Sequence, residues 1–259
     1  MRFPRALVRD LCDLIFPPAC HLCGAPARPG QLACAAHRLP RAPGGPRCGR
    51  CAGRLPPALP DGNDCAECRR RPLRLARVVA LGDYRDPPVL REWILAFKHG
   101  GRPALAAPLG RLLARRLAAA DGLDGEPVLV PVPLHPLRRL ERGFDQALLL
   151  ASEVSRRLDV PCRRALWRVR STPPQGEPHA GGRASNVRGA FRLHPEERRH
   201  VEGRRVWLVD DVLTSGATAE ACARVLRRGG ARRVSALVLG RAARSTIAAG
   251  GAMLDTAAP

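Results

Sequence analysis

The chain has little of several residue types on which other classes of protein depend. Only 3% of its 259 residues are aromatic, and Lys98 is the one lysine among 44 basic residues. No apolar run approaches the roughly 18 residues of a membrane-spanning helix. The N-terminal segment begins with basic residues, but Asp10 and Asp13 interrupt its apolar part, which argues against a secretory signal. We therefore expect a cytoplasmic protein with no membrane span.

The basic excess is the second feature of the composition. The 44 basic residues stand against 23 acidic ones, for a net charge of +21. This excess favours polyanionic partners such as nucleic acid or phosphorylated ligands. Because Arg, Ala, Pro and Gly dominate the whole chain, a coding bias with a solvated surface explains it equally well. Where arginine fills almost every basic position, Lys98 indicates a site that a guanidinium does not suit, unless it is there by chance.

Ten cysteines are present, and most of them lie near the N-terminus. Without an export signal, we interpret them as metal ligands before disulfides. Four pairs of ligands have two residues between their members, so that a tight turn can present both to one tetrahedral zinc ion. The pairs are Cys20 and Cys23, Cys34 and His37, Cys48 and Cys51, and Cys65 and Cys68. We predict two structural zinc ions, with the first pair joined to the second and the third to the fourth; a crossed pairing is the alternative.

These pairs fall in residues 18–72, a segment otherwise rich in Pro, Gly and Arg that could hardly build a core by itself. Metal binding would supply its folding energy, so we expect a double zinc ribbon with a structural role. Apolar residues at helical spacing predict an amphipathic helix in residues 1–17, which packs on its own domain or docks a partner. The cysteines outside the pairs, Cys12, Cys162 and Cys222, are expected to be ordinary buried thiols.

From about residue 75 the pattern changes to alternating strands and helices. Strands are predicted over residues 77–84, 126–134, 160–167, 204–211 and 232–242, and helices over 87–98, 102–120, 144–158 and 217–230. Such alternation predicts an α/β fold with a parallel sheet covered by helices on both faces. We place this domain at residues 75–243 and expect a flexible tail at 244–259.

The clearest candidate site is the stretch WLVDDVLTSGATAE, residues 207–220. Asp210 and Asp211 end an apolar strand, and in such sheets a ligand binds beyond the carboxyl ends of the strands. The following loop and helix start offer backbone amides and hydroxyls that suit a phosphate; they are Thr214, Ser215, Gly216, Ala217 and Thr218. Because carboxylates repel a phosphate, we expect them to hold ribose hydroxyls, or a Mg²⁺ that bridges ribose and pyrophosphate. A sugar phosphate suits both halves of the stretch.

The stretch VWLVDDVLTSGAT resembles the phosphoribosyl pyrophosphate (PRPP) motif of type I phosphoribosyltransferases. PVPLHPLRRLERGFDQA (131–147), TPPQ with RASNVRGAF (183–191), and the paired cysteines are similar to the ComF family of competence-type proteins. In that family a double zinc ribbon precedes a phosphoribosyltransferase domain. The resemblance covers the chain from about residue 11 to 243. Three positions depart from the family's usual residue: Asp145 stands for Asn, Ser215 for Thr and His37 for Cys.

The resemblance implies roles for residues outside this motif. Lys98 would meet pyrophosphate oxygens as a point charge, or it is a solvated helix end. Arg142 would lie on a phosphate in the same pocket, or on the surface. Arg183, with Gln175 and Asn186, belongs to a polar loop that closes over a reacting substrate or is an exposed connector. Lys98 and Arg183 are therefore the candidate catalytic residues.

Three functions follow from the resemblance. As an enzyme, the protein would transfer the phosphoribosyl group of PRPP, with Mg²⁺, to an acceptor that no residue identifies. As a binding protein of the DNA-uptake machinery, it would hold single-stranded DNA, with PRPP as regulator or relic. Because aromatic residues are scarce, we expect phosphate neutralisation to dominate DNA binding, with affinity falling steeply as salt rises. As a structural adaptor, it would dock a DNA-uptake motor protein through the ribbon and the first helix.

Overall fold

The structure is a computed structural model. It describes residues 17–28, 31, 33–39, 44–70, 72–86, 88–99, 101–120, 122–134, 139–141, 143–170 and 189–242. The expected N-terminal helix, apart from residue 17, and the expected tail at 244–259 lie outside these residues.

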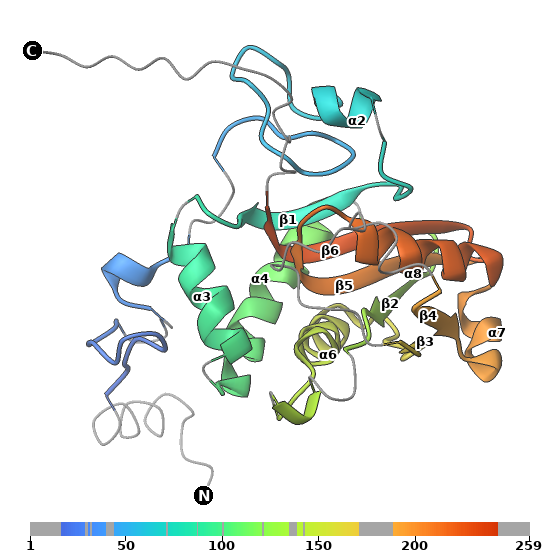
Figure 1. Cartoon of the computed structure of the whole chain (residues 1–259). Helices are drawn as coiled ribbons and strands as arrows, with labels where there is room; N and C mark the ends of the chain where they lie inside the picture. Colours follow the sequence, from blue (N-terminus) through green and yellow to red (C-terminus); the bar gives the residue numbers. More distant parts are fainter. Residues whose placement is uncertain are drawn as a thin grey trace, which may run out of the picture.

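A four-stranded parallel sheet forms the centre of the molecule (Figure 1). Its strands lie in the order β1 (Val78–Asp83), β6 (Arg233–Arg241), β5 (Arg205–Leu213) and β2 (Pro127–Pro131). The central strands β6 and β5 are apolar along most of their length because both faces of the sheet are covered. The predicted α/β fold with a parallel sheet is confirmed.

Three helices cover one face of the sheet: α3 (Pro88–His99), α4 (Ala106–Ala118) and α6 (Gln146–Leu158) (Figure 1). The short helix η2 (Pro103–Leu105) leads into α4. The helices bury large apolar side chains against this face, among them Trp93, Phe97 and Leu150. The predicted helices therefore cover the sheet as an amphipathic pattern requires.

The opposite face is covered by α8 (Ala217–Arg228) and by the hairpin of β3 (Leu166–Arg168) and β4 (Phe191–Leu193). The short helices η3 (Pro195–Glu197) and α7 (Arg198–Val201) follow β4. The cysteine-rich segment contributes η1 (Ala35–His37) and α2 (Ala66–Arg70), and its second half shares the core of this face. Within the part of the chain that the structure describes, none of the helices has the length and apolar character needed to cross a membrane.

The strand expected at residues 160–167 forms only in part. Cys162 makes one isolated parallel bridge with Leu129 of β2, after which the chain leaves the sheet and pairs as β3 with the unpredicted β4. The next ladder bonds on either side would need backbone N–H groups from Pro161 and Pro131, which proline lacks. The two prolines therefore limit this pairing to a single bridge.

Strand β5 extends two residues beyond its predicted end at Asp211. Val212 and Leu213 pair with Gly240 and Arg241 of β6, which runs alongside to its own last residue. The loop between β5 and α8 therefore shrinks to residues 214–216.

Candidate functional site

The acidic pair at the end of β5 lies against the single lysine of the chain. Lys98, in the last turn of α3, places its Nζ 2.9 Å from Asp211 Oδ2. The two side chains are only 19% and 12% exposed, so water screens the ion pair weakly. The backbone N–H of Asp211 donates to Asp210 Oδ1 at 2.8 Å. A basic and an acidic side chain far apart in the sequence thus meet near the carboxyl end of the central strand β5.

Asp210, the other carboxylate of the pair, is destabilised in its charged form. Burial, followed by the charge of Asp211, raises the pKa of Asp210 to about 7, although Lys98 lowers it. Asp145 also raises this pKa, and it caps α6 by accepting a hydrogen bond from Leu148 N at 3.0 Å. Asp is among the residues preferred at this N-cap position. A carboxyl group kept at a cost in stability marks a candidate site.

The loop after β5 presents the start of α8 to the same edge. Gly216 is the N-cap residue of α8, has a φ of +85°, and offers no side chain to cap the first-turn amides. Ser215 Oγ accepts a long hydrogen bond of 3.4 Å from Ala217 N. Thr214, Ser215, Ala217 and Thr218 are half-buried. The amides at the start of α8 and the hydroxyls beside them are groups that can receive an anion.

Glycine is required at residue 216 for two reasons. Its φ lies in the left-handed region, which L side chains rarely adopt. A Cβ on Gly216 would also lie 2.6 Å from Leu73 Cδ2. Leu73, the first residue after the cysteine-rich segment 18–72, packs against the loop at Gly216.

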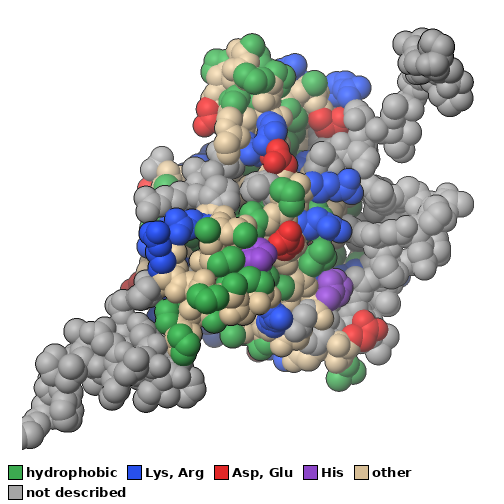
Figure 2. All heavy atoms as spheres, turned by 90° about the vertical axis from the view of Figure 1, so that its left-hand side faces the viewer, with side chains coloured by type: hydrophobic (Ala, Val, Ile, Leu, Met, Phe, Trp, Pro, Cys, Tyr) green, Lys and Arg blue, Asp and Glu red, His purple; other side chains and the backbone are tan. Residues whose placement is uncertain are grey.

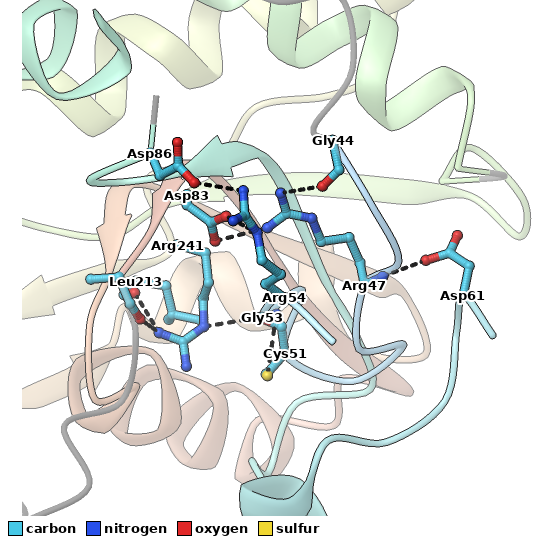
Figure 3. A network of polar contacts seen from close by, with 11 residues as sticks. Gly44, Arg47, Cys51, Gly53, Arg54, Asp61, Asp83, Asp86, Leu213 and Arg241 are labelled. Atoms are coloured by element: carbon cyan, nitrogen blue, oxygen red, sulfur yellow. Dashed lines mark hydrogen bonds and ion pairs between the residues drawn. The ribbon is translucent and has the colours of Figure 1, made fainter. Parts of the chain in front are cut away.

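Arg241, the last residue of β6, supports the loop from inside. Its side chain is 2% exposed, and its Nη1 donates to Leu213 O at 2.9 Å, to Thr214 O at 2.7 Å and to Ala242 O. Its Nε donates to Cys51 O at 3.0 Å (Figure 3). Sequence reasoning missed Arg241; the signal was a charged residue at the end of an otherwise apolar strand, hidden in an arginine-rich chain.

Several sequence-predicted residues lie outside the described part of the chain. These are Arg142, Gln175, Arg183 and Asn186. Of the predicted phosphoribosyl site, the structure therefore brings together Lys98, the two aspartates and the 214–218 segment.

The eight predicted metal ligands form two groups of four, each with ligand atoms within 4.8 Å of one another. The first group is Cys20, Cys23, Cys34 and His37; the second is Cys48, Cys51, Cys65 and Cys68. The first pair is thus joined to the second and the third to the fourth, in the predicted order. The two groups lie apart, the first beside α3 and the second over β1 and β6 (Figure 1).

The ligand separations fit zinc. A tetrahedral ion with Zn–S bonds of about 2.3 Å places two sulfurs about 3.8 Å apart. Cys23 Sγ and Cys34 Sγ are 3.9 Å apart, and Cys51 Sγ and Cys65 Sγ are 3.8 Å apart. Burial raises the pKa of the Cys20 thiol, but backbone amides, those of Cys23 and Cys34 first, outweigh it and lower the pKa to about 6. That environment favours the thiolate that a metal needs.

His37 has the partners of a metal-binding histidine. Its Nδ1 lies 3.3 Å from Cys34 Sγ and 3.5 Å from Cys20 Sγ, and its Nε2 lies 3.3 Å from Glu92 Oε2 on α3. A carboxylate on the far nitrogen fixes the ring and raises its basicity as a ligand. Trp93 Nε1 also donates to His37 O at 2.9 Å. His37 therefore directs one ring nitrogen toward the cysteines and the other toward Glu92.

One family model and several known proteins are similar to this chain. The family model "Phosphoribosyl transferase domain" matches residues 145–249. Competence protein F of Haemophilus influenzae is 34% identical over 170 residues, which cover 64% of this chain and 73% of that protein. DNA utilization protein YhgH of Escherichia coli K12 is 35% identical over 176 residues, which cover 66% of this chain and 75% of that protein. A solved glutamine PRPP amidotransferase from B. subtilis, complexed with ADP and GMP, is 21% identical with a TM-score of 0.38, and the match covers 56% of this chain and 30% of that one.

Proposed function

The chain belongs to the ComF family of competence and DNA-utilization proteins, and from that premise we propose that it binds PRPP with Mg²⁺ at the carboxyl end of β5, in the service of DNA uptake. One observation carries the proposal. The lone lysine, the acidic pair and the start of α8, whose N-cap glycine has no side chain, lie at the carboxyl end of the central strand β5. A ligand that carries both ribose hydroxyls and phosphates matches this combination.

Each part of the ligand has a chemical counterpart in the site. The 5′-phosphate accepts hydrogen bonds from the loop amides and the hydroxyls of Thr214, Ser215 and Thr218. The ribose hydroxyls donate to Asp210 and Asp211, which suits carboxylates better than a phosphate would. Lys98 then shares its charge between Asp211 and the pyrophosphate oxygens.

Transfer of the phosphoribosyl group is the reaction that such a site supports. A nucleophile forms a bond to ribose C1 while the bond from C1 to the pyrophosphate oxygen breaks, and the electron pair leaves with the pyrophosphate. Mg²⁺, bound with PRPP, would shield the charge that builds up on the leaving group. Lys98 stabilises the same charge. For Arg183, which lies outside the described residues, the same role rests on the family resemblance of the sequence.

Calorimetric titration of PRPP into zinc-loaded protein, with and without Mg²⁺, tests the proposal. We expect Mg²⁺-dependent binding to the wild type and its loss in the double variant Asp210→Asn, Asp211→Asn. Asp159→Asn is the matched control, because Asp159 ends α6 about 20 Å along the helix from its start near the site. Its left-handed φ of 52° also suits asparagine. Absence of binding to the wild type would refute the proposal.

Single-stranded DNA is a second candidate ligand, favoured by the β3–β4 hairpin. Trp167 is 46% exposed, its ring lies 4.5 Å from that of His194, and the exposed Arg192 is its partner across the hairpin. An aromatic ring beside a guanidinium is the combination on which single-stranded nucleic acids stack. On the face that Figure 2 shows, by contrast, the described Lys and Arg side chains are spread among other types and form no single basic patch.

Binding of a fluorescent single-stranded oligonucleotide tests this second candidate. Trp167→Ala should weaken binding about tenfold or more, because stacking on one aromatic ring contributes about 1–3 kcal/mol per base. Trp167→Phe retains a ring and should keep most of the affinity. Affinity should fall steeply between low and physiological salt. Equal affinities for the alanine variant and the wild type would remove the hairpin as the binding surface.

A further inference from the structure

One buried residue, Arg241, contacts both the second metal-ligand group and the loop of residues 214–216, which we call the phosphate loop. We propose that Arg241 is a positioning residue that couples the two sites, so that metal in the Cys48–Cys68 group favours PRPP binding and PRPP in turn favours retention of that metal. The proposal rests on the proposed function and adds to it a means of regulation.

The coupling is direct at the atomic level. Cys51 supplies its sulfur to the metal-ligand group and its carbonyl oxygen to Arg241 Nε, 3.0 Å away. The same guanidinium donates through Nη1 to the carbonyls of Leu213 and Thr214, at 2.9 and 2.7 Å (Figure 3). Leu213 ends β5 and Thr214 begins the loop. A ligand of the metal is therefore two hydrogen bonds away from the phosphate loop.

Burial makes this connection sensitive to the metal. Arg241 is 2% exposed, so water does not readily replace a lost carbonyl partner. A buried donor without a partner costs about 1–3 kcal/mol, and more when it is charged. If the ligand group opens, the Cys51 carbonyl is no longer fixed, and Arg241 must find a new arrangement at the expense of its bonds to the loop.

A second set of contacts links the same segments. Leu73, five residues after Cys68, packs behind Gly216. The backbone N–H of Arg74 donates to Glu220 Oε1 at 3.1 Å, in the first turn of α8. The chain that leaves the second group therefore holds the start of the helix whose amides face the phosphate.

The second group is also anchored to the end of β1. Arg47 Nη1 lies 2.8 Å from Asp83 Oδ1, and Arg54 Nε lies 3.4 Å from Asp83 Oδ2 (Figure 3). Arg54 Nη2 lies 2.7 Å from Asp86 Oδ2. Of these ion pairs the one between Arg47 and Asp83 is the least exposed, and it connects the residue before Cys48 to the end of β1.

The first metal-ligand group provides an internal comparison. Its described polar contacts beyond the cysteine-rich segment run to α3 and to Arg102: Glu92 and Trp93 contact His37, and Arg102 Nη1 donates to the carbonyls of His21 and Leu22. Loss of the first metal should therefore disturb the loop much less than loss of the second.

Matched ligand variants of the full chain test the coupling. Cys65→Ser removes a partly exposed ligand of the second group, and Cys23→Ser removes an exposed ligand of the first. Each should retain about half of the wild-type zinc. We expect PRPP affinity to fall about tenfold in Cys65→Ser, within the usual range of coupling between sites, and by a smaller factor in Cys23→Ser. Equal losses in the two variants would overturn the proposal.

The first arm of the reciprocal measurement uses the wild type alone. Zinc release to a chromogenic chelator is followed with and without PRPP and Mg²⁺. PRPP should slow the release of one of the two ions. Arg241→Lys keeps the charge but not the planar fork, and at a PRPP concentration that saturates the variant it should abolish this protection. Protection that is absent in the wild type, or undiminished in Arg241→Lys, contradicts the coupling.

The two levels of the proposal fail differently. If Cys65→Ser lacks the second zinc and binds PRPP with the same affinity as the wild type, the coupling is wrong and the proposed function stands. If the wild type binds no PRPP at full zinc content, the proposed function fails and the coupling with it. Hydrogen exchange of the amides of residues 213–217 gives a readout without PRPP: exchange should accelerate when Cys65→Ser empties the second group and stay near wild-type in Cys23→Ser.

Discussion

Lys98 Nζ lies 2.9 Å from Asp211 Oδ2, which joins the end of α3 to the end of β5 across the edge of the sheet. Both side chains are largely buried, so water screens the ion pair weakly, while burial makes Asp210 beside it difficult to ionise. One cation thus faces two adjacent carboxylates before any ligand binds. A ligand with hydroxyl donors can stabilise the charged form of Asp210 by hydrogen bonding.

Substitution of Lys98 tests the importance of this ion pair for the ligand. Lys98→Met should reduce PRPP affinity about tenfold or more, because it removes a charge from a poorly screened site. Lys98→Arg should restore only part of the affinity, since the guanidinium is larger and its donors form a fixed fork. Calorimetric titration measures both. Wild-type affinity in Lys98→Arg would show that any cation serves at this position.

The raised pKa of Asp210 predicts a trade-off between stability and binding. Because its folded-state pKa of about 7 lies above the ordinary value near 3.9, ionisation of Asp210 destabilises the fold progressively from about pH 4 to pH 7. Asp210→Asn should therefore raise the melting temperature more at pH 8 than at pH 6, by about 2–4 °C for each kcal/mol gained.

The same Asp210→Asn protein should bind PRPP more weakly than the wild type. Thermal unfolding at the two pH values, beside Asp159→Asn, measures the stability side of the trade-off. A gain that is equal at pH 6 and pH 8 would contradict the assigned pKa.

Glu92 is predicted to tune the first metal-ligand group through His37. Glu92→Gln should lower zinc affinity at that group about tenfold, since removal of a carboxylate that orients a metal-binding histidine commonly costs about 10–100-fold and Glu92 is partly exposed to water. Competition with a chelator of known affinity measures the change. Glu196→Gln, an exposed acid after β4, is the control. An unchanged affinity in Glu92→Gln would mean that the contact does not act on the metal.

Gly216→Ala should disturb the loop for two separable reasons. Strain from the positive φ costs about 1–3 kcal/mol, and the new Cβ would meet Leu73 Cδ2 at 2.6 Å. The double variant Gly216→Ala, Leu73→Ala relieves the clash but keeps the strain. Urea unfolding measures how much Gly216→Ala lowers the free energy of unfolding. The decrease should be smaller in the Leu73→Ala background than in the wild type. Equal values in the two backgrounds would show that the clash is absorbed by side-chain movement.

The local sequence pattern predicted the fold class because apolar strands, amphipathic helices and cysteine pairs follow one another closely along the chain. Alternating apolar strands and amphipathic helices predicted the parallel sheet, and the two-residue spacing of the cysteine pairs predicted ligand groups in the observed order. The predictions that failed concerned the lengths of two strands. The strand at 160–167 was limited to one bridge at Cys162 by two prolines, one of them on a different strand, and β5 ran on to Leu213 because β6 continued beside it.

The sequence by itself determined the types of residue at the site: two carboxylates, a glycine loop, one lysine and eight metal ligands. Only the tertiary structure decided which of them act together. Arg241, Glu92 and Leu73 resemble many other residues of an arginine-rich, leucine-rich chain, and their importance lies in partners 27 to 190 residues away. Local propensity and spacing are read within a few residues, whereas the partners of a buried guanidinium depend on how the sheet and the cysteine-rich segment pack.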